Sequence, residues 1–93
     1  MGPEQANLIT FKQAVLFTYS TERFLKKDKI RFFYALNGRP GKTGFLKECD
    51  ADHFGVSVIL VPSRFDKKFQ LFFQKWGIPF KRTELLIEPK RGY

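Results

Sequence analysis

The sequence predicts a small α+β fold, a single domain in which a sheet of three or four strands packs on one face against a Phe-rich helix. A chain of 93 residues has room for one domain. Because 43% of the residues are hydrophobic and twelve residues are Phe, most of the apolar side chains must be buried in a core. The last third of the chain carries strand, helix and strand patterns in succession, which predicts a C-terminal strand–helix–strand unit.

The Phe-rich helix is predicted over residues 63–76. Before it, residues 56–61 are β-branched and apolar on both faces, which is typical of an interior strand, and Pro62 ends that strand. Ser63 would cap the helix, with Asp66 three residues later as its partner. The aromatic residues recur at helical spacing and form one stripe: Phe65, Phe69, Phe72, Phe73 and Trp76. We expect this stripe to be core, packed on the sheet.

The sequence also predicts where the Phe-rich helix ends. Gly77 can adopt the left-handed conformation that ends a helix, and Ile78 can then pack back on Phe73 in a Schellman motif. Residues 80–88 return to a strand pattern. One face of that strand would carry Thr83, Leu85 and Ile87.

The first half of the chain is less regular. Apolar residues alternate over residues 14–20 and predict a strand, although a helix beginning at Thr10 is the alternative. Ser20 or Thr21 can cap a short helix immediately afterwards. Residues 38–44 form a turn or loop by their Gly and Pro content, and the acidic stretch after them fits no single element.

Residues 29–37 fit two structures. As a strand, they place four apolar residues on one face: Ile30, Phe32, Tyr34 and Leu36. As a helix, they show no clean apolar stripe, but Asn37 and Gly38 would end a helix well. We favour the strand, which would point Phe33 outward between two cations, and the helix remains the open alternative.

The chain is strongly basic, and its positive charge is concentrated in one segment. With 17 Lys and Arg against 9 Asp and Glu, the formal net charge is +8. Eight basic residues and one acid, Asp28, lie between Arg23 and Lys47, so this segment alone carries +7. A cationic surface attracts polyanions, of which nucleic acid is the commonest. A solvated surface that only keeps the protein soluble is the alternative.

The same segment is rich in aromatic residues, which suits single-stranded nucleic acid. Lys and Arg neutralise phosphates, and exposed aromatic rings stack on unpaired bases. We therefore predict a nucleic-acid-binding protein, for RNA or DNA, whose sequence specificity is low because no segment resembles a recognition helix that enters a groove. The predicted binding residues are Arg23, Lys26, Lys27, Lys29, Arg31, Phe33, Tyr34, Arg39, Lys42, Lys81 and Arg82. In this prediction Phe33 or Tyr34 stacks on bases, unless another element covers Phe33.

The motifs for chemistry are incomplete. Gly41, Lys42 and Thr43 resemble the end of a phosphate-binding loop, but the glycine required five residues earlier is Leu36. The single cysteine excludes a disulfide within the chain and a cysteine metal site. His53 lies in a small acidic cluster that lacks a second set of metal ligands at a suitable spacing. We therefore predict no catalytic residue, no metal and no cofactor.

Two other functions stay open. One is a protein-interaction subunit, for example a homodimer joined through a sheet edge or an aromatic patch. The other is a small metal-independent nuclease that uses His53 with Lys or Arg, and this enzymatic reading is the least favoured.

The expected location follows from two features of the sequence. Residues 1–9 lack the basic start and apolar run of a signal peptide, and we expect them and residues 89–93 to be flexible tails. The longest apolar run, Val58 to Val61, is far too short to cross a bilayer. We therefore expect no membrane partner and a cytoplasmic protein, or a nuclear one in a eukaryotic cell.

Overall fold

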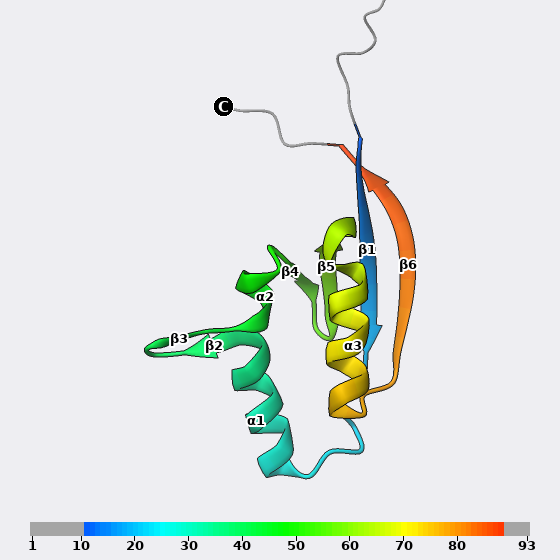
Figure 1. The fold of residues 1–93 in the computed structure, drawn as a ribbon. Helices are drawn as coiled ribbons and strands as arrows, with labels where there is room; N and C mark the ends of the chain where they lie inside the picture. Colours follow the sequence, from blue (N-terminus) through cyan, green and yellow to red (C-terminus); the bar gives the residue numbers. More distant parts are fainter. Residues whose placement is uncertain (1–10, 89–93) are drawn as a thin grey trace, which may run out of the picture.

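The computed structural model describes residues 11–88, which form a four-stranded antiparallel sheet, a two-stranded ribbon and three α-helices (Figure 1). In chain order the elements are β1 (Lys12–Tyr19), α1 (Lys26–Asn37), β2 (Gly38–Arg39), β3 (Lys42–Thr43), α2 (Phe45–Glu48), β4 (Asp52–Gly55), β5 (Val58–Pro62), the 3-10 turn η1 (Ser63–Phe65), α3 (Asp66–Trp76) and β6 (Phe80–Ile87). The α+β prediction is therefore confirmed. The predicted tails, residues 1–9 and 89–93, lie outside the described residues. None of the helices in the described part combines the length and the apolar composition needed to cross a membrane.

The sheet has the strand order β4-β5-β1-β6. β1 pairs antiparallel with β5 and with β6, so β5 and β6 run parallel to each other on its two sides. Parallel strands need a crossover connection, and α3 supplies it. This is the predicted strand–helix–strand unit, with β1 inserted between its strands. The ribbon β2–β3 is separate from the sheet, and Figure 1 shows it projecting away from the strands.

The core lies between one face of the sheet and α3. Val15 and Phe17 alternate along β1, are buried, and face the helices. The centroid of the Phe17 ring lies 5.8 Å from that of Phe69 and 5.5 Å from that of Phe73. Burial of each of these rings stabilises the fold by roughly 1.5–3 kcal/mol. The figures show α1, α2 and α3 on this same side of the sheet, so its other face carries no helix within the described residues.

The predicted aromatic stripe of α3 is core, as expected. Phe69 and Phe73 are fully buried at its centre. The other three members are partly buried against the core: Phe65, Phe72 and Trp76. Residues at this spacing lie on one side of a helix, and this side of α3 faces the sheet and α1.

The two ends of α3 differ in how well the sequence predicts them. Gly77 has a φ of 68° and its N–H donates to the carbonyl of Gln74 at 3.0 Å, while the Ile78 N–H donates to the carbonyl of Phe73 at 2.9 Å. This is the predicted Schellman motif. The predicted Ser63 cap is wrong, because the helix begins through a 3-10 turn and no described side chain caps it.

The prediction of a strand over residues 29–37 is wrong, since α1 is helical throughout this range. The buried residues of α1 are Phe32 and Leu36, which lie one turn apart and dock on the core. Its other large apolar residues are exposed: Ile30 to 46%, Phe33 to 57% and Tyr34 to 43%. Apolar residues therefore surround the helix, and their scatter hides the helical period from the sequence. Tertiary docking through the two buried residues decides the structure.

After α1 the chain turns back sharply into the ribbon. Gly38 has a φ of 85°, and a Cβ on Gly44 would lie 2.3 Å from the carbonyl carbon of Asn37 and from the nitrogen of Gly38. Glycine is therefore required at residue 44, and it lets the ribbon return directly against the end of α1. The short helix predicted after Ser20 is wrong, because the described chain forms a loop there and α1 begins at Lys26.

Candidate nucleic-acid interface

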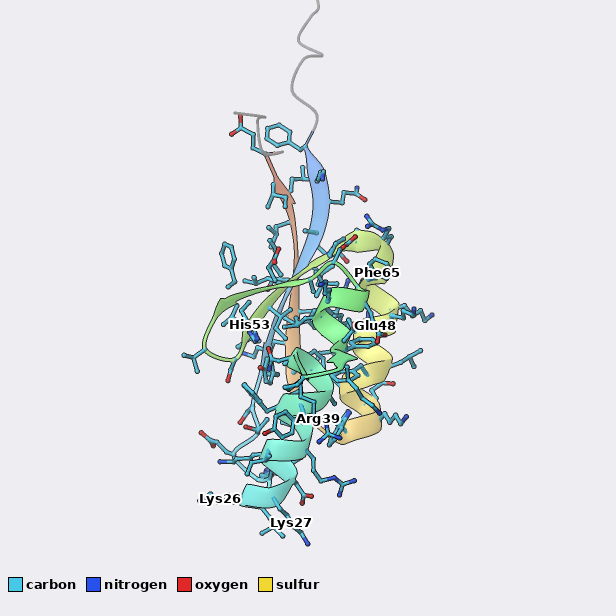
Figure 2. All side chains as sticks on the ribbon, turned by 90° about the vertical axis from the view of Figure 1, so that its left-hand side faces the viewer. Lys26, Lys27, Arg39, Glu48, His53 and Phe65 are labelled. Atoms are coloured by element: carbon cyan, nitrogen blue, oxygen red, sulfur yellow. The ribbon has the colours of Figure 1, made fainter. Side chains whose placement is uncertain are left out.

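The helix α1 turns four of the nine predicted cations toward solvent. Phe32 and Leu36 anchor one side of the helix on the core, so its exposed sides can meet a ligand. The exposed cations on it are Lys26, Lys27, Lys29 and Arg31. Figure 2 shows Lys26 and Lys27 at the first turn of α1 and Arg39 at its other end. The predicted cations thus lie along the first half of the helix, and Arg39 of the ribbon lies at its other end.

Three elements enclose an open hollow of about 330 Å³ beside the C-terminal half of α1. Its lining residues come from α1, the ribbon and the last position of α3, and we call this site the basic hollow: Arg31, Tyr34, Ala35, Arg39, Lys42, Thr43 and Trp76. The guanidinium carbon of Arg39 lies 5.5 Å from the centroid of the Tyr34 ring, within cation–π range. The Trp76 ring packs against Phe32, with centroids 5.4 Å apart. Contact with the core therefore holds one wall of the basic hollow in place.

Few acids compensate the cations of the basic hollow. Within residues 11–88, no carboxylate forms an ion pair with Arg39 or Lys42. Arg31 Nη1 lies 3.8 Å from Asp28 Oδ1, but the arginine side chain is 72% exposed, so water screens the pair and it contributes at most about 1 kcal/mol. Arg39 and Lys42 are also directly opposite each other in the ribbon, where like charges repel. A bound anion would relieve that repulsion.

The other flank of α1 carries an exposed aromatic ring. Phe33 is 57% exposed and lines, with Lys29 and His53, an open hollow of about 320 Å³. The amide nitrogen of Asn37 donates to the carbonyl of Phe33 at 3.1 Å, so the amide oxygen accepts from His53 Nε2 at 2.6 Å. These bonds tie the last turn of α1 to β4. Phe33 is thus exposed beside Lys29, on a helix and not on the predicted strand, whereas Arg31, the second cation predicted to flank it, lines the basic hollow.

Two of the remaining predicted residues are exposed but lie away from the basic hollow. Arg23 is in the loop before α1 and lines a separate hollow with Gln74 at the end of α3. Lys81 is exposed on β6. Its neighbour Phe80 points into the core, with its ring centroid 5.3 Å from that of Phe73. Because side chains alternate along a strand, Lys81 projects from the sheet face opposite to the helices.

Arg82 forms a clamp between β6 and α3. Its Nε donates to Asp66 Oδ1 at 3.2 Å, and its Nη2 donates to Glu84 Oε2 at 3.1 Å. Hydrogen bonds to Asp66 and then to Glu84 raise the pKa of the guanidinium, so its charge is already engaged within the fold. The structure therefore does not bring Lys81 and Arg82 together with the cations of α1 and the ribbon.

The residues that suggested chemistry make structural contacts. Asp50 forms an ion pair with Arg64 at 2.7 Å, and His53 is bonded to Asn37. The described residues contain no group of three His, Cys, Asp or Glu placed to hold a metal ion. Cys49 is fully buried, and burial raises the pKa of its thiol, which keeps it in the unreactive protonated form at neutral pH.

Sequence reasoning misses Trp76 and Thr43 as members of the basic hollow. It assigns Trp76 to the core alone, whereas the ring packs on the core and also lines the basic hollow. A signal for this double role exists, because Trp76 is the last residue of the aromatic stripe and stands directly before the glycine that ends α3. Thr43 carries no such signal, since its place depends on the return of the ribbon.

No protein-family model, curated protein or solved structure matches the chain. The function must therefore be inferred from the residues and their geometry. Two features bear most directly on it, the exposed cations along α1 and the basic hollow at its end.

Proposed function

We propose that this protein binds single-stranded nucleic acid with low sequence specificity, through α1 and the ribbon β2–β3. The observation that carries the proposal is the convergence of Arg31, Arg39 and Lys42 around two aromatic residues, Tyr34 and Trp76. Cations neutralise backbone phosphates, and rings offer stacking surfaces that every base can use. The combination suits an unpaired strand, whose bases are free to leave their neighbours.

The phosphate-binding part of the proposal follows the line of charge on α1. Lys27 and Arg31 lie one turn apart on the same flank as Tyr34, and the basic hollow continues that flank into the ribbon. Bound phosphates would reduce the repulsion between Arg39 and Lys42, which the free protein must tolerate. Binding is therefore expected to be strongest at low salt and to weaken steeply as salt is added.

The base-binding part rests on rings that the core does not need. Phe33 and Tyr34 are adjacent in sequence, exposed on neighbouring flanks of α1, and their centroids are 6.0 Å apart. Low specificity is expected because phosphate contacts carry no sequence information and stacking accepts every base. The amide of Asn37, which could read a base edge, is already bonded to Phe33 and to His53.

Fluorescence anisotropy with labelled single-stranded RNA, single-stranded DNA and duplex DNA at several salt concentrations tests this function. The variant R39Q/K42Q removes two charges from the basic hollow, and the control K12Q/K67Q removes two exposed charges from β1 and α3. We expect R39Q/K42Q to weaken single-strand binding and to lower the slope of log K against log salt by about 1.4, since each phosphate contact contributes about 0.7. The control should bind nearly as the natural protein does.

Two results would contradict the proposal. The first is an absence of binding to all three nucleic acids at low salt. The second is an equal loss of affinity in R39Q/K42Q and K12Q/K67Q, because net charge alone would then account for binding. Tighter binding to duplex DNA than to either single strand would replace the stacking role of Phe33 and Tyr34 by a purely electrostatic one.

A further inference from the structure

The two edges of the four-stranded sheet differ in how readily they can accept another strand. β4 is four residues long, and its register with β5 is interrupted between His53 and Gly55. Short and irregular edges discourage pairing with other chains. β6 is eight residues long and pairs with β1 without interruption, from Lys12 opposite Ile87 to Tyr19 opposite Phe80. Within residues 11–88, no strand pairs with the outer side of β6.

The side chains of β6 are arranged in two rows. One row points toward the helices and contains Phe80, Arg82, Glu84 and Leu86. The other row points toward the opposite face and contains Lys81, Thr83, Leu85 and Ile87. Leu86 is 61% exposed, although it lies on the side of the sheet that carries the core. An exposed apolar residue on a regular edge strand is a contact that a second strand could cover.

We propose that β6 pairs antiparallel with β6 of a second copy of this chain, about a twofold axis at Thr83. Two identical antiparallel strands always bring one residue opposite itself, so the identity of that residue sets the register. With Thr83 on the axis, Arg82 lies opposite Glu84 of the second copy, and the same pair recurs on the other side of the axis. Phe80 then lies opposite Leu86 of the second copy and covers its exposed side chain, and on the other face Lys81 lies opposite Leu85.

The neighbouring registers are less favourable. An axis at Arg82 or at Glu84 places two like charges directly opposite each other, which destabilises a strand pair. An axis at Lys81 has the same defect. An axis at Leu85 pairs only residues 83–87 of the two β6 strands, so Arg82 and Phe80 both lie outside the paired residues and Leu86 gains no aromatic cover. Charge complementarity and apolar coverage therefore select the register centred on Thr83.

Within one copy, Arg82 already donates to Asp66 and Glu84. Its side chain is therefore ordered on the helix side of β6, and the Glu84 carboxylate of the second copy would add to these bonds. An axis perpendicular to the sheet joins the two sheets edge to edge and keeps both helical layers on one side. The two copies of α1 then lie on the same face of the joined sheet. Pairing through β6 does not depend on nucleic-acid binding, because the basic hollow and β6 share no residue.

Sedimentation velocity of the full chain, from micromolar to near-millimolar concentration, measures the association. We expect a monomer–dimer equilibrium in the natural protein. The variant E84K places a lysine opposite Arg82 of the second copy, and R82E places a glutamate opposite Glu84. Each variant alone should dimerise at least about tenfold more weakly, because like charges then face each other. An equimolar mixture should dimerise again, since every charged pair in the mixed dimer is complementary.

A second measurement keeps the test independent of these charges. The variant T83C places a cysteine at the axis, opposite itself, at a separation suited to a disulfide. T18C carries an exposed cysteine in β1 and is the matched control. Cys49 is buried in both variants and should not react. We expect mild oxidation to crosslink T83C and to leave T18C monomeric.

The proposal fails if the natural protein stays monomeric over the whole concentration range. It also fails if a dimer forms but E84K leaves its affinity unchanged, or if T18C crosslinks as fast as T83C. Circular dichroism of each variant checks that the fold is retained. If R82E does not fold, E84K and T83C decide the question by themselves. Anisotropy on the same samples shows whether nucleic-acid binding persists, so the two proposals can fail separately.

Discussion

The helices α1 and α3 are nearly equal in length, 12 and 11 residues, but they use their apolar residues differently. α3 packs across the sheet face and also contacts α1, so it has neighbours on two sides. Phe69 and Phe73 pack against the sheet, and Phe72 and Trp76 pack against Phe32 of α1. The helix α1 buries one narrow strip and leaves its other large apolar residues exposed.

This difference between the two helices indicates which residues are candidates for function. A residue of α3 that faces the core is explained by packing, because its removal leaves a cavity. Phe33 and Tyr34 on α1 have no such explanation, since each is substantially exposed. Sites at which local sequence and fold disagree are often functional. The exposed rings of α1 also lie next to exposed cations, which is the reason that α1 carries the proposed interface.

The largest expected effect contrasts a buried ring with an exposed one. F73A removes a fully buried ring that contacts Phe17, Phe69 and Phe80, and should lower the free energy of unfolding by roughly 3–5 kcal/mol. F33A should change it by less than about 0.5 kcal/mol. Urea unfolding followed by circular dichroism measures both. A comparable loss in F33A would show that α1 and α3 are equivalent in the core.

For binding, we expect the opposite order, in which the exposed ring of α1 matters and an exposed residue of α3 does not. F33A should weaken the affinity for single-stranded nucleic acid by about 1–3 kcal/mol if Phe33 stacks on a base. The control is L71A on α3, because Leu71 is 56% exposed and Phe33 is 57% exposed. Anisotropy should show little change for L71A. Equal affinities of F33A and the natural protein would remove Phe33 from the interface.

A third experiment tests whether the ribbon must be held against α1. G44A introduces a Cβ 2.3 Å from backbone atoms of Asn37 and Gly38, and should destabilise the fold by roughly 1–3 kcal/mol while it displaces Arg39 and Lys42. The milder control is G41A at the tip of the ribbon, where an added Cβ would meet no atom within 4 Å and only the φ of 85° disfavours alanine. Thermal unfolding and anisotropy should both be more affected in G44A. The reverse order would mean that the tip, and not the return of the chain, positions the cations.

The smallest effect separates structural cations from binding cations. R82Q breaks the clamp to Asp66 and Glu84 and should lower the melting temperature slightly, with no loss of nucleic-acid affinity. R39Q should do the opposite, since Arg39 contacts the exposed Tyr34 ring and forms no ion pair with a carboxylate within residues 11–88. Thermal unfolding and anisotropy on the two variants give the comparison. Loss of affinity in R82Q alone would place the interface on β6.

The C-terminal unit could be predicted well because its signals are local. The stripe of α3 repeats over three turns, and Gly77 with Ile78 ends the helix by a motif that the sequence specifies directly. The cations of the proposed interface could also be found, since eight basic residues crowd one segment. Arg82 could not be separated from them, because its partner Asp66 is sixteen residues away and meets it through tertiary structure alone.

The sequence by itself determined the fold class, the core of α3 and the segment that carries the charge, because these depend on composition and on short-range periodicity. Tertiary structure decided that α1 is a helix, since two buried residues outweigh an ambiguous pattern once α3 provides a surface for them. It also assembled the basic hollow, because the close return at Gly44 and the packing of Trp76 on Phe32 bring three separate segments together. Contacts between distant segments leave no periodic pattern in the sequence, and this is the physical reason that the basic hollow can be recognised only in the folded chain.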